Sequence, residues 1–120
     1  MMNIKQAQEI IVSVIPLAQA EMSQPENAGN PITTIRILTS YIKKMIEQGR
    51  EDELGKALHL MEYMHEKGER RLQNAVENIF VFSLDSILTA CPESLRGMVT
   101  GKIPIGIYTA YINQMYRSGY

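Results

Sequence analysis

The sequence predicts an all-α protein, a single compact bundle of about five helices built from αα-hairpins around a central hydrophobic helix. Apolar residues recur at the three- and four-residue spacing of a helix through most of the 120 residues. The breaks between these stretches are short, which favours antiparallel neighbours. The stretch from Glu69 to Cys91 contains neither glycine nor proline and is apolar over most of its circumference. A helix of that kind is expected to be surrounded by others.

The first expected helix begins at Ile4 and has Asn3 as a candidate cap. Its apolar positions share one face: Ile4, Ala7, Ile11, Val14 and Ala18. Pro16 either kinks this helix or ends it and begins the next turn. Residues 24–29 have the composition of a loop.

The second and third helices have start and end signals in the sequence, and the third is predicted to form an αα-hairpin with the central helix that follows it. Asn30 and Pro31 occupy the favoured cap and first positions of the second helix, and Gly49 is the expected residue after its end. Acidic residues 51–53 begin the third helix, where the helix dipole favours them. Gly55 costs this helix about 1 kcal/mol relative to alanine, so packing is expected to explain it. Gly68 ends the third helix.

The central helix has a broad apolar face and a narrow polar strip. The apolar face consists of Leu72, Val76, Ile79, Phe80, Leu84, Ile87 and Leu88, widened by Val81 and Phe82. The polar strip consists of Arg71, Asn74, Asn78, Asp85 and Thr89. After Pro92, residues 92–96 are expected to form one helical turn and residues 97–102 a loop, with a small hairpin at Thr100-Gly101 as the alternative.

A final helix follows Pro104 and carries an aromatic stripe that is expected to be core: Tyr108, Ile112, Met115 and Tyr116. Tyr111 and Tyr120 lie off the centre of this stripe and are surplus to packing. Tyrosine is a common interface anchor. We therefore expect an interaction surface that includes these two tyrosines, together with Asn74, Asn78 and Asp85 of the polar strip. The alternative is a packed helix whose hydroxyls reach water.

Composition and charge limit the classes of partner and the cellular location that are expected for this chain. The formal charge of −1 and the absence of a basic cluster give no sign of nucleic acid or of an anionic membrane. No apolar run approaches a membrane span. One cysteine, Cys91, suits a reducing compartment. Residues 10–20 imitate a secretory signal, but only Lys5 precedes them as a basic residue. One domain over residues 1–120 and a cytoplasmic location are expected.

The candidate chemical groups are few. His59 and His65 point about 120° apart on one helix, so neither a metal site nor a cofactor is expected. Cys91, at the end of an apolar helix, is expected to be a buried structural thiol. Glu77 lies among apolar residues, where acid–base catalysts are found. The alternatives for Glu77 are an ion pair with another helix or a place at the rim of the core.

Residues 45–96 resemble a family of small bacterial all-helical domains of unknown function. The residues that carry the resemblance are Gly49 to Leu54, Ala57-Leu58, Met61-Glu62-Tyr63, Gly68-Glu69-Arg70, Asn74-Ala75-Val76 and Phe80-Val81-Phe82-Ser83-Leu84, followed by Pro92 to Arg96. The resemblance implies a bacterial, cytoplasmic, immunity-protein-like domain without known enzymatic activity, and it transfers no catalytic residue.

Three functions follow from these observations. The first is a non-catalytic module that binds another protein, in the manner of an immunity-like inhibitor. The second is a homo-oligomeric structural or regulatory protein, which makes the partner a second copy of the chain. The third is a small enzyme that uses Glu77 with His59 or His65. The first is the expectation, because the sequence shows no catalytic motif.

Overall fold

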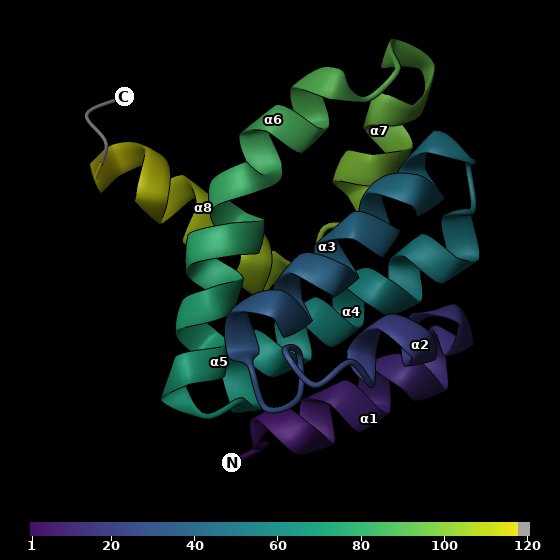
Figure 1. Cartoon of the computed structure of the whole chain (residues 1–120). Helices are drawn as coiled ribbons and strands as arrows, with labels where there is room; N and C mark the ends of the chain where they lie inside the picture. The colour runs from purple at the N-terminus through teal and green to yellow at the C-terminus, as the bar shows by residue number, and fades with distance from the viewer. Residues whose placement is uncertain (118–120) are drawn as a thin grey trace.

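The computed structural model describes residues 1–117 and confirms the all-α class. The elements in chain order are α1 (Ile4–Val14), the 3₁₀ turn η1 (Pro16–Ala18), α2 (Gln19–Met22), α3 (Pro31–Glu47), α4 (Glu51–Lys67), α5 (Arg70–Ala75), the π-helical segment η2 (Val76–Val81), α6 (Phe82–Ala90), α7 (Glu93–Lys102) and α8 (Ile105–Arg117). The chain from α5 through η2 to α6 is one continuous helical run (Figure 1). Helix α1 ends at Val14, and Pro16 begins the next turn, η1. This is the second of the two alternatives given for Pro16.

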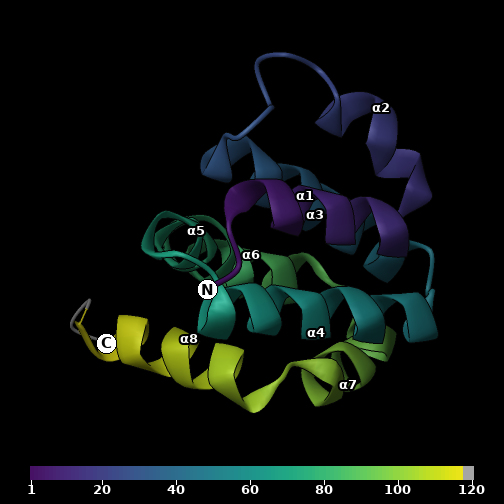
Figure 2. The ribbon, with the colours of Figure 1, turned by 90° about the horizontal axis from the view of Figure 1, so that it is seen from below.

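Helix α4 lies in the middle of the bundle. Figure 2 shows α1 and α3 on one side of it and α7 and α8 on the other, and α4 packs against all four. Its buried residues serve both sides: Leu54, Ala57, Leu58, Leu60, Met61 and Met64. Helix α3 is also buried along most of its length. The centre of the fold is thus shared among α3, α4 and the run from α5 to α6, whereas a single central helix at 69–91 was expected.

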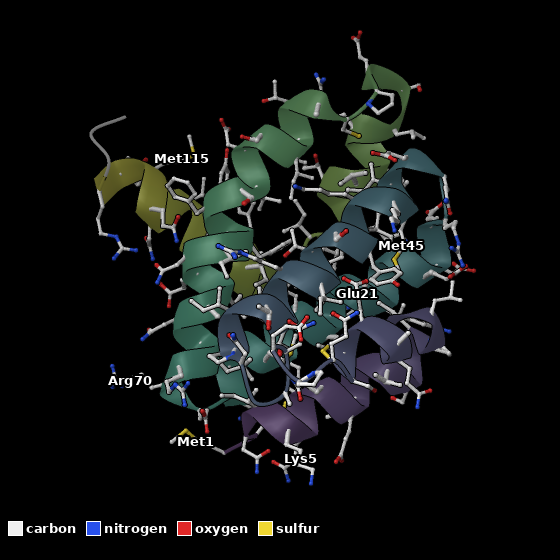
Figure 3. The ribbon with its side chains drawn as sticks, in the orientation of Figure 1. Met1, Lys5, Glu21, Met45, Arg70 and Met115 are labelled. Carbon is white, nitrogen blue, oxygen red and sulfur yellow. The ribbon has the colours of Figure 1, made fainter. Side chains whose placement is uncertain are left out.

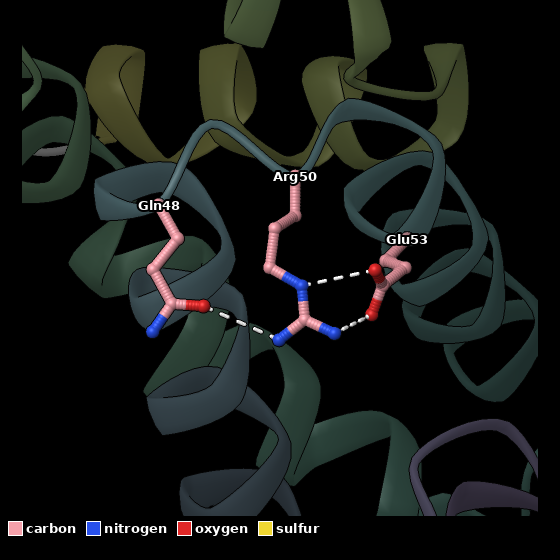
Figure 4. Close-up of polar contacts among 3 residues, drawn as sticks. All are labelled: Gln48, Arg50 and Glu53. Atoms are coloured by element: carbon pink, nitrogen blue, oxygen red, sulfur yellow. Dashed lines mark hydrogen bonds and ion pairs between the residues drawn. The ribbon is translucent and has the colours of Figure 1, made fainter.

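The expected signals at the ends of α3 operate as predicted. The Asn30 side chain accepts hydrogen bonds from the backbone N–H groups of Ile32 and Thr33. At the other end Gly49 has φ +63°, which glycine adopts without steric cost. Arg50 follows it and bridges the turn into α4, contacting Gln48 on one side and Glu53 on the other (Figure 4). These contacts lie at the turn that joins α3 to α4.

The segment from Glu69 to Cys91 contains a π-turn that the sequence pattern did not reveal. The backbone N–H of Phe82 donates to the carbonyl of Glu77, five residues earlier. In an uninterrupted α-helix, Leu84 and Leu88 lie about 120° and 160° around the axis from Leu72. One extra residue turns them back by about 100°, into line with Leu72. The buried residues of the run therefore lie on one side, whereas a helix apolar over most of its circumference was expected.

Residues 97–102 belong to a helix, so the predicted loop was wrong. Helix α7 continues from Glu93 to Lys102 through two glycines. Val99 is buried, and Leu95 and Met98 pack against the core. Tertiary packing thus overrides the weak helix propensity of this stretch.

Helix α8 is rotated relative to the expected stripe. Ile107 is its buried residue, and Ala110 and Tyr111 pack against the core. Tyr108 and Tyr116, which were expected in the core, are 41% and 75% exposed.

Two polar contacts fix the rotation of α8. The backbone N–H of Gly106 donates to Glu62 Oε2 of α4 at 2.8 Å, next to the positive end of the helix dipole. Gln114 Nε2 donates to the Glu77 carbonyl at 2.9 Å. The pattern of residues along one helix carries no information about its contacts with other helices. The predicted stripe was therefore assigned to the wrong face of α8.

Gly55 of α4 is not required by packing, contrary to expectation. A Cβ atom there would meet the Lys102 side chain at 3.6 Å, an ordinary van der Waals distance. Gly55→Ala is therefore expected to raise the free energy of unfolding by about 0.5–1 kcal/mol, through the lower entropy of the unfolded chain. Urea unfolding measures this. Gly68→Ala is the contrasting control, because its Cβ would lie 2.4 Å from the Met64 carbonyl oxygen. A destabilised Gly55→Ala protein would show that this space is tighter than described.

Candidate functional site

The outer face of the run from α5 to α6 is a line of exposed residues. The polar strip of Arg71, Asn74, Asn78, Asp85 and Thr89 is exposed throughout. Phe82 lies among them, 76% exposed, although it was expected at the edge of the apolar face. With the extra residue of the π-turn, Phe82 points about 180° away from Leu72. We call the polar strip together with Phe82 the exposed ridge.

Two hollows flank Phe82. The first, the α3–α6 groove, has a volume of about 480 Å³ and is lined by Lys43 of α3, by Phe82, Ile87 and Ala90 of α6, and by Cys91 after it. The second, the α8 hollow, has a volume of about 530 Å³ and is lined by Glu77, Asn78, Phe82, Gln114 and Arg117. An aromatic ring that stands between two hollows offers an apolar contact to any surface laid across the ridge.

The structure brings several predicted interaction residues together. The Tyr111 hydroxyl donates to Asp85 Oδ1 at 2.7 Å, which joins α8 to α6. The rings of Tyr108 and Tyr111 lie 6.2 Å apart between centroids. Asn74 and Asn78 share the exposed ridge with Asp85. Tyr111 is partly buried and supports the ridge from α8, so it is not the surplus side chain that was expected. Tyr120 lies outside the described residues.

Glu77 and His65 form a second candidate site, a histidine paired with a carboxylate. His65 Nε2 lies 3.2 Å from Glu77 Oε2, which joins α4 to η2. His59 does not take part; it borders a different hollow beside Lys102. A carboxylate next to an imidazole orients the ring, as in many active sites. The side chains that line the neighbouring α8 hollow with Glu77 are Asn78, Phe82, Gln114 and Arg117, and none of them is a nucleophile.

The remaining candidate groups are engaged elsewhere. Cys91 is buried at the end of α6, where its thiol contacts the Pro92 carbonyl, in agreement with the expected burial. Arg96 donates to the carbonyls of Leu88 and Cys91 and so caps α6. Within residues 1–117, no three His, Cys, Asp or Glu side chains gather where a metal ion could bind them. None of the helices described is long and apolar enough to cross a membrane.

Phe82 is the residue of the exposed ridge that sequence reasoning misplaced. Its position carried a usable signal, because it is four residues after Asn78 and three before Asp85, and so lies on the same helical face as both. The hydrophobicity of the side chain outweighed this spacing in the prediction. The π-turn then moved Phe82 from the edge of the apolar face to the side opposite it.

Fold and surface together define a small all-α domain with an exposed, aromatic-centred ridge. The chain belongs to the family described as Domain of unknown function (DUF7674), whose model matches residues 9–119. The family therefore extends beyond residues 45–96, over which the resemblance was noted, and includes α2, α3 and α8. None of the curated proteins and none of the solved structures matches this chain significantly.

Proposed function

We propose that this chain is a non-catalytic protein-interaction module and that it contacts its partner through the exposed ridge. The observation that supports the proposal is Phe82, 76% exposed between the α3–α6 groove and the α8 hollow. Burial of a phenylalanine side chain contributes about 1.5–3 kcal/mol, which makes it a suitable anchor at the centre of an interface. Asn78 and Asp85, one turn away on either side, supply a polar rim.

The resemblance supports a finer form of this proposal, a bacterial, cytoplasmic inhibitor that resembles an immunity protein. Such an inhibitor acts by covering a surface of another protein. The segment from Phe80 to Leu84, which carries part of the resemblance, includes the exposed Phe82. An inhibitor also needs no catalytic group, cofactor or metal of its own.

The contact between His65 and Glu77 favours a second candidate, a small enzyme. Glu77 of this pair lines the α8 hollow, and the pair has the arrangement of an acid–base dyad. The same contact also serves as a clasp between α4 and η2. We place the enzyme second because the α8 hollow adds no nucleophile to the pair.

The interaction module is tested by a binding experiment with matched variants. Tagged wild-type chain is expected to retain a defined protein from the source cells, and Phe82→Ala is expected to lose it. Truncating an anchor of this kind weakens binding by about tenfold or more. The measurement is quantitative mass spectrometry of the retained proteins, followed by a titration with the purified partner.

Leu17→Ala is the matched control. Leu17 is also 76% exposed but lies in η1, on another part of the molecule. The control is expected to retain the same protein as the wild type. If Phe82→Ala and Leu17→Ala retain identical sets of proteins in identical amounts, the ridge is not the binding surface and the proposal fails.

A further inference from the structure

Helix α8 is attached to the bundle through little buried apolar surface. Ile107 is the one buried residue among its thirteen described residues, whereas α3 buries nine residues and α4 buries six. Ile105, Tyr108 and Tyr116 are 78%, 41% and 75% exposed. Figure 3 shows Met115 of the same helix at the edge of the molecule, away from the centre of the bundle. Separating α8 from its neighbours therefore exposes much less apolar surface than unfolding α3 or α4.

Hydrogen bonds to carboxylates on two other helices supply part of the attachment of α8. The Gly106 N–H donates to Glu62 of α4, and the Tyr111 hydroxyl donates to Asp85 of α6. A Cβ atom at residue 106 would lie 2.8 Å from Glu62 Oε2, so the glycine lets this carboxylate approach closely. Hydrogen bonds to a charged acceptor are stronger than neutral ones, but their net strength is modest because water replaces them when the helix separates.

The preceding helix, α7, has contacts of its own at the end next to α8. Lys102 Nζ lies 3.6 Å from Glu51 Oε1 of α4, and Val99 is buried. Helix α8 begins at Ile105, after the short connection of residues 103–104. Rotation about this connection is sufficient to separate α8 and leave α7 in place. A helix of thirteen residues is only marginally stable by itself in water, so a separated α8 also loses its internal hydrogen bonds.

We infer that α8 opens as a unit while the rest of the bundle stays folded, and that its bonds to Glu62 and Asp85 hold it closed. In the open form, the wall of the α8 hollow that Gln114 and Arg117 provide is lost. The exposed ridge then keeps Phe82 but lacks the hollow on one side of it. A partner that fills this hollow binds the closed form alone. That consequence rests on the proposed function, whereas the opening itself does not.

Hydrogen–deuterium exchange of the full chain, resolved by residue with NMR, tests the opening. In the wild type, the amides of residues 108–117 are expected to be protected at least about 100-fold less than the most protected amides of α3 and α4. Tyr111→Phe removes the hydroxyl but keeps the ring, and it is expected to lower the protection of residues 108–117 by about tenfold. Glu62→Ala removes the other contact and is expected to have an effect of similar size. Because the helix opens as a unit, each variant is expected to change all of these amides by a common factor.

Two control variants separate the opening of α8 from the unfolding of the whole chain. Tyr108→Phe also removes a hydroxyl from α8, but Tyr108 is 41% exposed and contacts Tyr111 through its ring, so the exchange of α8 is expected to stay unchanged. Ile35→Val removes one methyl group from a completely buried position in α3. It is expected to lower the protection of α3 and α4 severalfold and to leave that of α8 unchanged, because α8 opens while α3 stays folded.

Three results would overturn the inference. Equal protection of α8 and α3 in the wild type, or an Ile35→Val variant that lowers both by the same factor, would mean that α8 opens only when the whole chain unfolds. Acceleration confined to the residues beside each substitution would mean that α8 frays in parts. A Tyr111→Phe variant that exchanges like Tyr108→Phe would mean that the bond to Asp85 does not hold α8 closed.

The outcome is independent of the proposed function, because none of these measurements involves a partner. An α8 that opens as expected, in a chain that binds no protein through Phe82, would end the interaction module and leave this inference standing. A chain that binds through Phe82 but whose α8 is as protected as α3 would end this inference and leave the interaction module standing.

Discussion

Phe80→Ala is expected to lower the free energy of unfolding by about 3–5 kcal/mol, through lost burial and the cavity left behind. Phe80 is completely buried in η2, the segment that packs against α3, α4 and α8. A cavity there is lined by several helices that meet from different directions, so none of them can close it by moving alone. Urea unfolding, with the slope against denaturant fitted separately for each variant, measures the effect.

Asn78→Ala provides the matched control for Phe80→Ala. Asn78 is only two residues away but exposed on the ridge, so its replacement is expected to change the free energy of unfolding by no more than about 0.5 kcal/mol. Equal losses of unfolding free energy for the two variants would mean that η2 does not bury Phe80 and expose Asn78 as described.

Deletion of Asn78 is expected to leave the protein folded, whereas deletion of His59 is expected to unfold it. A π-turn holds one residue more than an α-helix, so removing Asn78 converts η2 to regular helix. Leu72 and Leu84 then keep their directions, and a cost of at most about 1 kcal/mol is expected. His59 lies within the regular helix α4. Its removal rotates one half of α4 by about 100° against the other.

The His59 deletion therefore takes either Leu54 and Leu58 or Met61 and Met64 out of the core. The expected cost exceeds about 5 kcal/mol, which is comparable with the whole stability of a small domain. Circular dichroism and thermal melts of the two deletion variants make the comparison. Two equally unstable deletions would show that the extra residue at η2 is required by the packing around it rather than merely accommodated.

The accuracy of the sequence-based predictions differed among the elements for identifiable reasons. Asn30, Pro31, Gly49 and Gly68 were placed correctly, because capping and glycine geometry depend on a few neighbouring residues. The helix over residues 93–102 was missed, because α7 owes its stability to packing on α4 and α6 rather than to propensity. The facing of α8 was misjudged, because Glu62 and Gln114 set it from contacts far away in the sequence.

Some residues of the candidate site could likewise be predicted from the sequence, and others could not. Asn74, Asn78 and Asp85 were identified from a polar strip at helical spacing, and all three are exposed on one ridge. Tyr111 was identified as part of the surface but lies partly buried beneath it, bonded to Asp85. The pairing of Glu77 with His65 stood as one of several alternatives, since residues on two different helices cannot be aligned from either helix alone.

By itself the sequence determined the all-α class, the starts and stops of α3 and α4, and the polar side of the run from α5 to α6. Those features follow from local backbone chemistry and from a periodic pattern within one helix. Only the tertiary structure decided that α3 and α4 share the centre, that α8 turns Tyr116 outward, and that Phe82 stands exposed on the ridge. Each of these depends on how one helix is rotated against another. A single inserted residue in η2 changes that rotation by about 100° without leaving a mark in the hydrophobic pattern.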